Sequence, residues 1–230
     1  VAESGLIDDA LILLIAEPTG GTAYIGQKGE LWIECRFTGA AAHGSLPETG
    51  RSALYPACEF CLRLREIADR FEPMPGRGRT SVNIGTLRTG VQVNIVPDEA
   101  RLELDLRPVS VTERDRVLAE IRSLGEEIAT RWKTQFSARV FNDRAPIVSA
   151  VDDPWVGRFL RSHAEGTSAA GPSTIAPYST DAVAIVPARP VPVIIYGPGR
   201  IEQAHQPDEY LDLVSLKDAL QVIGRFVGLP

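Results

Sequence analysis

Residues 80–109 read TSVNIGTLRTGVQVNIVPDEARLELDLRPV and contain two predicted strands. In the second strand, at 99–109, Leu102, Leu104 and Leu106 alternate with charged residues. Alternation with a period of two is typical of a strand with one buried face. A Pro-Asp pair marks a turn between the two strands. The stretch is therefore predicted to form an antiparallel pair.

The segments on either side extend this pair to the order β-α-β-β-α-β. This is the split βαβ arrangement of a four-stranded antiparallel sheet with two helices on one side. Thr112 is expected to cap the second helix. The unit as a whole is expected to cover about 29–143. Its other elements are predicted at 30–39 (strand), 51–71 (helix), 112–132 (helix) and 134–143 (strand).

The remaining residues are typical of pieces of an α/β domain into which the split βαβ unit is inserted. The apolar run ALILLIA predicts a buried strand at 10–17, and PVPVIIYG predicts another at 190–197. The predicted domains are 1–28, 29–143 and 144–230. Helices are predicted at 151–164 and 214–227, and a surface loop at 164–174.

Composition excludes several classes of function. The 230 residues carry a net charge of −6, and a nucleic-acid-binding face would require a basic surface. No apolar run reaches the roughly 20 residues that span a bilayer. The acidic start VAESGLIDD lacks the basic region of a signal peptide. Cys35, Cys58 and Cys61 are interpreted as buried thiols rather than a redox or zinc pair, and a cytoplasmic location is expected.

Glu17 and His205 each follow a predicted buried strand. The carboxyl ends of strands in open α/β sheets are where binding sites form. A carboxylate and an imidazole suit Zn²⁺ or a similar first-row ion, although each could simply face water at a strand end. A catalytic zinc uses three protein ligands, so these two do not complete a site.

Four further residues are candidates with open alternatives. His43 lies in a loop of small residues and is either a donor that polarises a carbonyl or a solvated histidine. Arg107 and Asn94 flank one strand, and the arginine either binds a substrate carboxylate or forms a surface ion pair. Asp181 is expected to cap a helix or to orient a metal ligand. His163 is expected at the surface.

These residues resemble a known family. The segments that carry the resemblance are AEPTG (16–20), IGQKGEL (25–31), GAAAHGSLPETGRSA (39–53), VNIVPDEARLELDLRP (93–108) and GPGRIEQAHQPDEYL (197–211). They are similar to the dinuclear zinc hydrolases that include acetylornithine deacetylase, succinyl-diaminopimelate desuccinylase and carboxypeptidase G. The resemblance implies a zinc-peptidase-like α/β catalytic domain with an inserted ferredoxin-like lid and dimerisation domain.

The resemblance also implies roles. Glu17 and His205 would each bind one of two zinc ions, with cobalt or manganese as possible replacements. His43 would stabilise the oxyanion in the partner's active site, and Asn94 and Arg107 would bind the substrate, an N-acyl amino acid or peptide. A homodimer through the inserted domain is expected, with the edge strand and helix near 30–71 as its interface.

The family's HxD motif, bridging aspartate and Glu-Glu pair have no counterpart in this sequence. We therefore expect a remnant of the catalytic domain, with weak or partial metal binding and no amide hydrolysis by this chain alone. We also expect the strands at 10–17 and 190–197 to have an unpaired edge. The alternative is a non-catalytic dimerisation or binding module.

Overall fold

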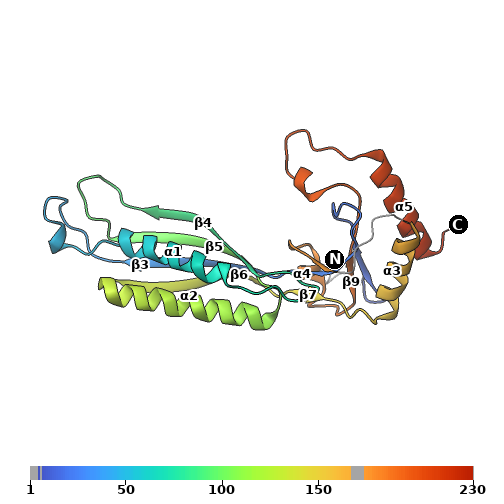
Figure 1. Ribbon diagram of the computed structural model, residues 1–230, viewed down its shortest axis with the longest axis horizontal. Helices are drawn as coiled ribbons and strands as arrows, with labels where there is room; N and C mark the ends of the chain where they lie inside the picture. Colours follow the sequence, from blue (N-terminus) through green and yellow to red (C-terminus); the bar gives the residue numbers. More distant parts are fainter. Residues whose placement is uncertain (1–4, 6, 167–173, 230) are drawn as a thin grey trace. The chain divides into compact units, whose positions relative to one another are not determined.

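The computed structural model describes residues 5, 7–166 and 174–229 (Figure 1). The chain forms two compact units. Unit 1 comprises 1–28, 75–78 and 146–230, and unit 2 comprises 29–74 and 79–145. Most of the surface loop predicted at 164–174 lies outside the described residues.

Unit 2 is a four-stranded antiparallel sheet with two helices, as the split βαβ prediction requires. The strand order is β4-β5-β3-β6, and β3 pairs with both β5 and β6. The first strand is therefore interior, and its prediction as an edge strand is wrong. The edges belong to β4 and β6. The elements are β3 (Glu30–Thr38), α1 (Leu54–Asp69), β4 (Ser81–Thr89), β5 (Glu99–Arg107), α2 (Val111–Trp132) and β6 (Gln135–Arg144), with a short 3₁₀ helix at Pro47–Thr49.

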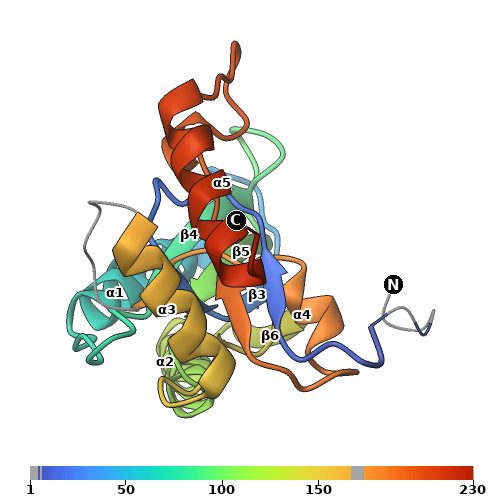
Figure 2. The same cartoon turned by 90° about the vertical axis from the view of Figure 1, so that its right-hand side faces the viewer.

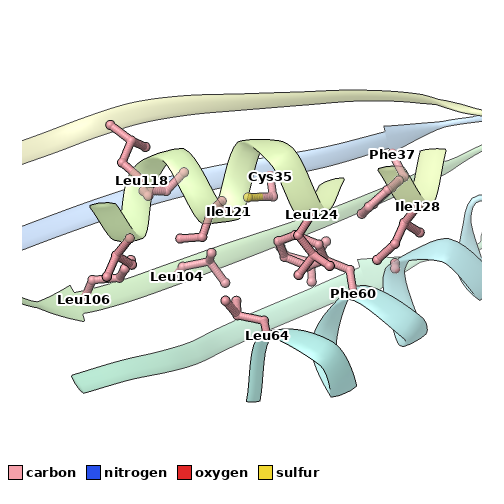
Figure 3. Packing of buried hydrophobic residues seen from close by; sticks show 14 of the residues in the cluster. Cys35, Phe37, Phe60, Leu64, Leu104, Leu106, Leu118, Ile121, Leu124 and Ile128 are labelled. Carbon is pink, nitrogen blue, oxygen red and sulfur yellow. The ribbon is translucent and has the colours of Figure 1, made fainter. Parts of the chain in front are cut away.

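The core of unit 2 lies between the sheet and the two helices. The alternating leucines Leu102, Leu104 and Leu106 all point into it, and each is at most 2% exposed. Figure 3 shows Leu104 and Leu106 of β5 in the same cluster as Leu64 of α1 and Ile121 of α2. Burying one such side chain contributes about 1.5–3 kcal/mol, so this layer accounts for much of the unit's stability.

Helix α2 begins at a different cap from the predicted one. The Ser110 hydroxyl accepts a hydrogen bond from the Glu113 backbone N–H at 3.1 Å. Thr112 lies within the first turn of the helix. Ser110 has the extended backbone that a cap needs, with φ −154° and ψ 163°, so the prediction of Thr112 was wrong by two positions.

Unit 1 is built on a mixed sheet of short strands in the order β1-β9-β2-β7, with β8 also paired to β2. Strands β1 and β9 are parallel and lie within the predicted segments 10–17 and 190–197. Strand β1 is the edge of the sheet in the described part of the chain. The strands are β1 (Leu13–Ile15), β2 (Tyr24–Gln27), β7 (Ile147–Val148), β8 (Thr174–Ala176) and β9 (Val193–Ile195).

Helices cover both faces of this sheet. Ile194 packs with α3 (Pro154–Gly166) and α5 (Leu213–Val227), which lie side by side in Figure 2. Val193 and Ile195 point the other way, into the cluster that includes Ala182 of α4 (Ala182–Ile185). The alternating apolar residues of β9 thus serve two cores.

His163 of α3 belongs to the interior of unit 1. It is 5% exposed, and its Nε2 lies 2.7 Å from the Gly21 carbonyl oxygen. Its ring meets Tyr196 edge to face. The expectation of a surface residue is therefore wrong, because α3 turns this position toward the sheet.

Helices long and apolar enough to cross a membrane are not found in the part of the chain that the structure describes.

Candidate functional site

The carboxyl ends of β1 and β9 meet closely in unit 1. Glu17 follows β1 and Gly197 follows β9, and a Cβ on Gly197 would lie 2.6 Å from the Glu17 carbonyl oxygen. Only glycine permits this approach. The buried hydroxyl of Thr19 donates to the Gly197 carbonyl at 3.1 Å. The segment that carries Glu17 is thereby fixed to the one that leads to His205.

Glu17 has a half-buried carboxylate in an electrostatically mixed environment. Burial raises the pKa of this carboxyl, and the negative charge of Asp181 raises the pKa further. His205 acts in the opposite direction and lowers the pKa. Asp181 and His205 are therefore both close enough to Glu17 for their charges to act on it. A nearby positive charge would stabilise the ionised form of such a carboxylate.

Asp181 lies in a loop that is anchored by hydrogen bonds to the Gln27 side chain. The Gln27 side chain is fully buried, and its oxygen accepts from the backbone N–H and the hydroxyl of Thr180 at 3.0 and 2.6 Å. Its amide nitrogen donates to Ser179 at 3.1 Å. Asp181 is at the N-cap position of α4 but makes no side-chain capping bond. The Asp181 carboxylate is therefore not used by the helix, and its charge acts on Glu17.

His205 lies in the exposed loop between β9 and α5. Its backbone is left-handed, with φ +62°, and its N–H donates to the Glu209 carboxylate at 3.1 Å. This conformation costs roughly 1–2 kcal/mol for a residue with a Cβ, so the loop must hold it in place. Helix α5 is capped by Asp212, whose carboxylate accepts hydrogen bonds from the backbone N–H groups of Val214 and Ser215.

A cavity of about 450 Å³ is lined by Pro18 and Tyr178 among others but not by Glu17, and all of its lining residues belong to unit 1. Tyrosines, threonines, Arg200 and Glu202 give it a polar wall. Within the described residues, no group of three His, Cys, Asp or Glu side chains is placed to hold a metal ion. The donors Glu17 and His205 suit a first-row ion by type, but two ligands are fewer than the three of a catalytic zinc site.

His43 and Asn94 lie together at one end of unit 2. The Gly44 N–H donates to the Asn94 carbonyl at 2.7 Å, and the backbones of His43 and Ile95 form an isolated antiparallel β-bridge. The backbone N–H of Ser45 donates to Nδ1 of His43. In the neutral ring, Nε2 therefore carries the proton. Both side chains are exposed, so His43 presents a free N–H donor to its surroundings.

Arg107 lies at the opposite end of the same sheet. It pairs with Ser81, whereas Asn94 adjoins the end marked by Thr38 and Glu99. The strand between the two ends spans roughly 25 Å at about 3.4 Å per residue. The sheet therefore separates Arg107 from Asn94 and His43 within one chain.

The Arg107 guanidinium is already engaged by two carboxylates. It bonds to Glu30 at 2.8 Å and to both oxygens of Asp105, and Asn142 donates to the other Glu30 oxygen. Three of its five N–H groups are used, which leaves two for another acceptor. Arg107 is thus held in one orientation by its neighbours.

Comparison with known proteins finds a family model that matches part of the chain. Residues 25–133 are matched by the family model of the peptidase dimerisation domain, M20_dimer. Residues 25–133 therefore form a peptidase dimerisation domain.

The relatives are more specific. An acetylornithine deacetylase of Myxococcus xanthus is 28% identical, over 94% of this chain and 56% of its own length. A "Probable succinyl-diaminopimelate desuccinylase" of Staphylococcus aureus strain N315 is 26% identical, over 92% of this chain and 58% of its own length. The chain is a relative of these deacetylases and desuccinylases. It spans somewhat more than half of their length.

Solved structures show the same fold. A tripeptidase of Staphylococcus aureus has a TM-score of 0.80 at 21% identity and covers 97% of this chain and 58% of its own. Aminopeptidase PepT of Bacillus cereus has a TM-score of 0.75 at 19% identity, with coverages of 94% and 56%. At such identities the likeness establishes the fold alone.

Sequence reasoning missed the residues that position the site. Gln27 and Thr19 lie in short strands and turns without a periodic signal, and their roles depend on partners more than 150 residues away. No local pattern could have found these partners. The glycine at 197 was a detectable signal, because its segment GPG follows a buried strand directly.

Proposed function

We propose that this chain takes part in metal-dependent hydrolysis of amide bonds in N-acyl amino acids or peptides. The observation that supports this is that Glu17, which follows β1, is acted on by the charges of both Asp181 and His205, the latter in the loop after the parallel strand β9. The desolvated Glu17 carboxylate is repelled by Asp181 and attracted by His205, and a cation would relieve the repulsion.

Glu17 and His205 are the residues that would hold the metal, with Zn²⁺ as the first candidate and cobalt or manganese as replacements. Such an ion, when bound, supplies a Lewis acid and lowers the pKa of water. Asp181 would orient the ligands without binding the ion itself. With two ligands, affinity in this chain is expected to be weak.

Unit 2 would supply the substrate contacts. Nε2–H of His43 would donate to the oxyanion that develops on the amide carbonyl. The two remaining N–H groups of Arg107 would bind a substrate carboxylate. An N-acyl amino acid is much shorter than the distance between these residues, so His43 would act on a substrate bound by a second copy of the chain.

A homodimer through unit 2 is therefore part of the proposal. The interior position of β3 moves the expected interface to α1 and the edge strand β4, which pack together. Leu62 on α1 is 69% exposed, and Leu87 on β4 is 39% exposed. Apolar side chains beside an open strand edge are typical of a surface that pairs.

Metal titration tests the proposal. Calorimetry with Zn²⁺ and Co²⁺ should show binding to the 230-residue chain that is lost in Glu17→Gln and in His205→Ala. Glu202→Gln is the matched control, since Glu202 lies in the same loop region and is not an expected ligand. Equal binding by Glu17→Gln and the unsubstituted chain would contradict the assignment. Hydrolysis assays with N-acetylornithine and N-succinyl-diaminopimelate then test the activity itself.

Sedimentation over a range of concentrations tests the dimer. Leu62→Glu and Leu87→Arg should shift the chain to monomer, whereas Leu220→Glu, on an exposed position of α5 in unit 1, should not. A chain that is monomeric at every concentration would contradict the dimer.

A further inference from the structure

A cavity of about 440 Å³ opens in unit 2, at the end of the unit that holds His43 and Asn94. It is formed by residues from 44–55, 95–97 and 132–133. Most of its wall is apolar and includes Leu54, Ile95 and Pro97. Small-molecule sites in proteins have this size and this mainly apolar lining, with a few polar groups that orient the ligand.

Two aromatic rings form part of the wall. Tyr55 of α1 and Trp132 of α2 are stacked, with ring centroids 5.5 Å apart and an angle of 19° between the planes. The indole N–H of Trp132 donates to the Glu59 carboxylate at 2.7 Å, which fixes the orientation of the ring. Tyr55 is nevertheless 57% exposed, and Trp132 is 39% exposed. A fixed and accessible aromatic surface favours a flat apolar ligand, because stacked rings gain more than the area they bury.

The charged residues that line the cavity are both cations, although the chain carries a net charge of −6. Arg51 and Lys133 are exposed, and neither side chain forms an ion pair with any residue that the structure describes. The nearby Glu59 carboxylate is already paired with Arg131 at 2.5 Å. An apolar wall that carries two unpaired cations is complementary to an anion with an apolar body.

The backbone of Lys133 gives a separate reason to consider its side chain. Lys133 ends α2 in the left-handed region, with φ 54° and ψ 36°. Glycine is usual at such a position, because a Cβ is disfavoured there. A lysine that accepts this strain places a positive charge beside the cavity. A cation also suits the end of a helix, so folding and binding must be measured separately.

We propose that this cavity binds an aromatic carboxylate, with its ring against Tyr55 and Trp132 and its carboxylate paired with Arg51 and Lys133. The cavity lies wholly within unit 2, and none of the candidate metal ligands or substrate-binding residues lines it. The inference is therefore independent of the proposed function.

Titration of the 230-residue chain with 2-naphthoate tests the inference, followed by calorimetry and by quenching of tryptophan fluorescence. Arg51→Gln and Lys133→Gly should each weaken binding by at least about threefold, because each removes one partly exposed charge pair. The neutral 2-naphthamide should bind about tenfold more weakly than 2-naphthoate, since it pairs with neither cation. Arg88→Gln is the control, because Arg88 is an exposed arginine of β4 outside the cavity, and it should bind as the unsubstituted chain does.

Melting temperatures separate binding from folding. Lys133→Gly relieves the left-handed backbone, so this variant is expected to stay folded while it loses the charge. If folded Arg51→Gln and Lys133→Gly bind 2-naphthoate as tightly as the unsubstituted chain, the inference is wrong. The same holds if 2-naphthamide binds as tightly as 2-naphthoate.

Two further outcomes would place the ligand or the surface elsewhere. If binding persists in both cavity variants and is lost in Arg107→Gln, the carboxylate pairs with the proposed substrate arginine, and the inference is wrong. If 2-naphthoate does not bind and Tyr55→Ala converts a dimer to a monomer in sedimentation, the aromatic surface contacts a second copy of the chain, and the inference is again wrong. Absence of binding without a change in sedimentation also overturns it.

Discussion

The side-chain oxygen of Gln27 accepts two hydrogen bonds from Thr180, one from the backbone N–H at 3.0 Å and one from the hydroxyl at 2.6 Å. The two residues are 153 positions apart, and both are buried. Gln27 is the last residue of β2, and through this contact it fixes the position of the loop that contains Tyr178 and Asp181. The position of Asp181 in the candidate site therefore depends on Gln27, which is not itself a candidate metal ligand or substrate-binding residue.

Replacing Gln27 by Leu should destabilise unit 1 by about 2–4 kcal/mol, because it leaves the N–H and hydroxyl of Thr180 buried without partners. Hydrogen exchange should show faster exchange at residues 179–182. Gln221→Leu is the control, since Gln221 is an exposed residue of α5, and it should have no such effect. Unchanged protection in Gln27→Leu would show that the loop is held by other contacts.

The sequence predicted unit 2 better than unit 1 for a physical reason. Strands of nine or ten residues, such as Glu99–Arg107, repeat their alternation often enough to be identified. Strands of two to four residues, such as Ile147–Val148, carry no period at all. Position in the sheet is also not local information, so the interior place of β3 could not be read from its alternating residues.

The candidate site shows the same limit. Glu17 and His205 could be selected because each follows a long apolar run. The ion pairs of Arg107 depend on Glu30, which is 77 residues away, and no pattern within one strand could indicate them. The exposure of Cys58 contradicts its prediction as a buried thiol, because position 58 faces outward on α1.

Ser110→Ala should lower the free energy of unfolding of unit 2 by about 1 kcal/mol, within a range of roughly 0.5–2, because the first turn of α2 loses its cap. Ser123→Ala lies on an exposed position of the same helix and should be neutral or slightly stabilising, since alanine favours helix. Urea unfolding monitored by circular dichroism compares the two. Equal effects would indicate that Ser110 does not act as a cap.

The three cysteines should react with a thiol reagent at very different rates. Burial raises the pKa of Cys35 to about 12, and Cys61 is half-buried, whereas Cys58 is exposed. At pH 8 the native chain should show one fast thiol, which Cys58→Ser removes, and all three thiols only after unfolding.

The raised pKa of Cys35 also predicts a dependence of stability on pH. An acid whose pKa rises on folding favours the protonated form, so its contribution is complete below the unfolded value near 9.0. It is lost as the pH rises from there toward about 12. Cys35→Ala should show a smaller loss of stability across this window than the unsubstituted chain. An identical slope would mean that Cys35 does not titrate in this way.

Arg107→Ala should destabilise unit 2 by about 1–3 kcal/mol, because it leaves the half-buried carboxylates of Glu30 and Asp105 without their cation. Arg101→Ala is the matched control on the same strand, since its ion pair with Glu99 is exposed and its loss should not shift the unfolding midpoint. Urea unfolding measures both. If the two variants are equally stable, Arg107 is not fixed by its carboxylates, and its guanidinium is free to turn wholly toward a ligand. If Arg107→Ala is the less stable, the residue is pre-oriented, and only its two remaining N–H groups are available for a substrate carboxylate.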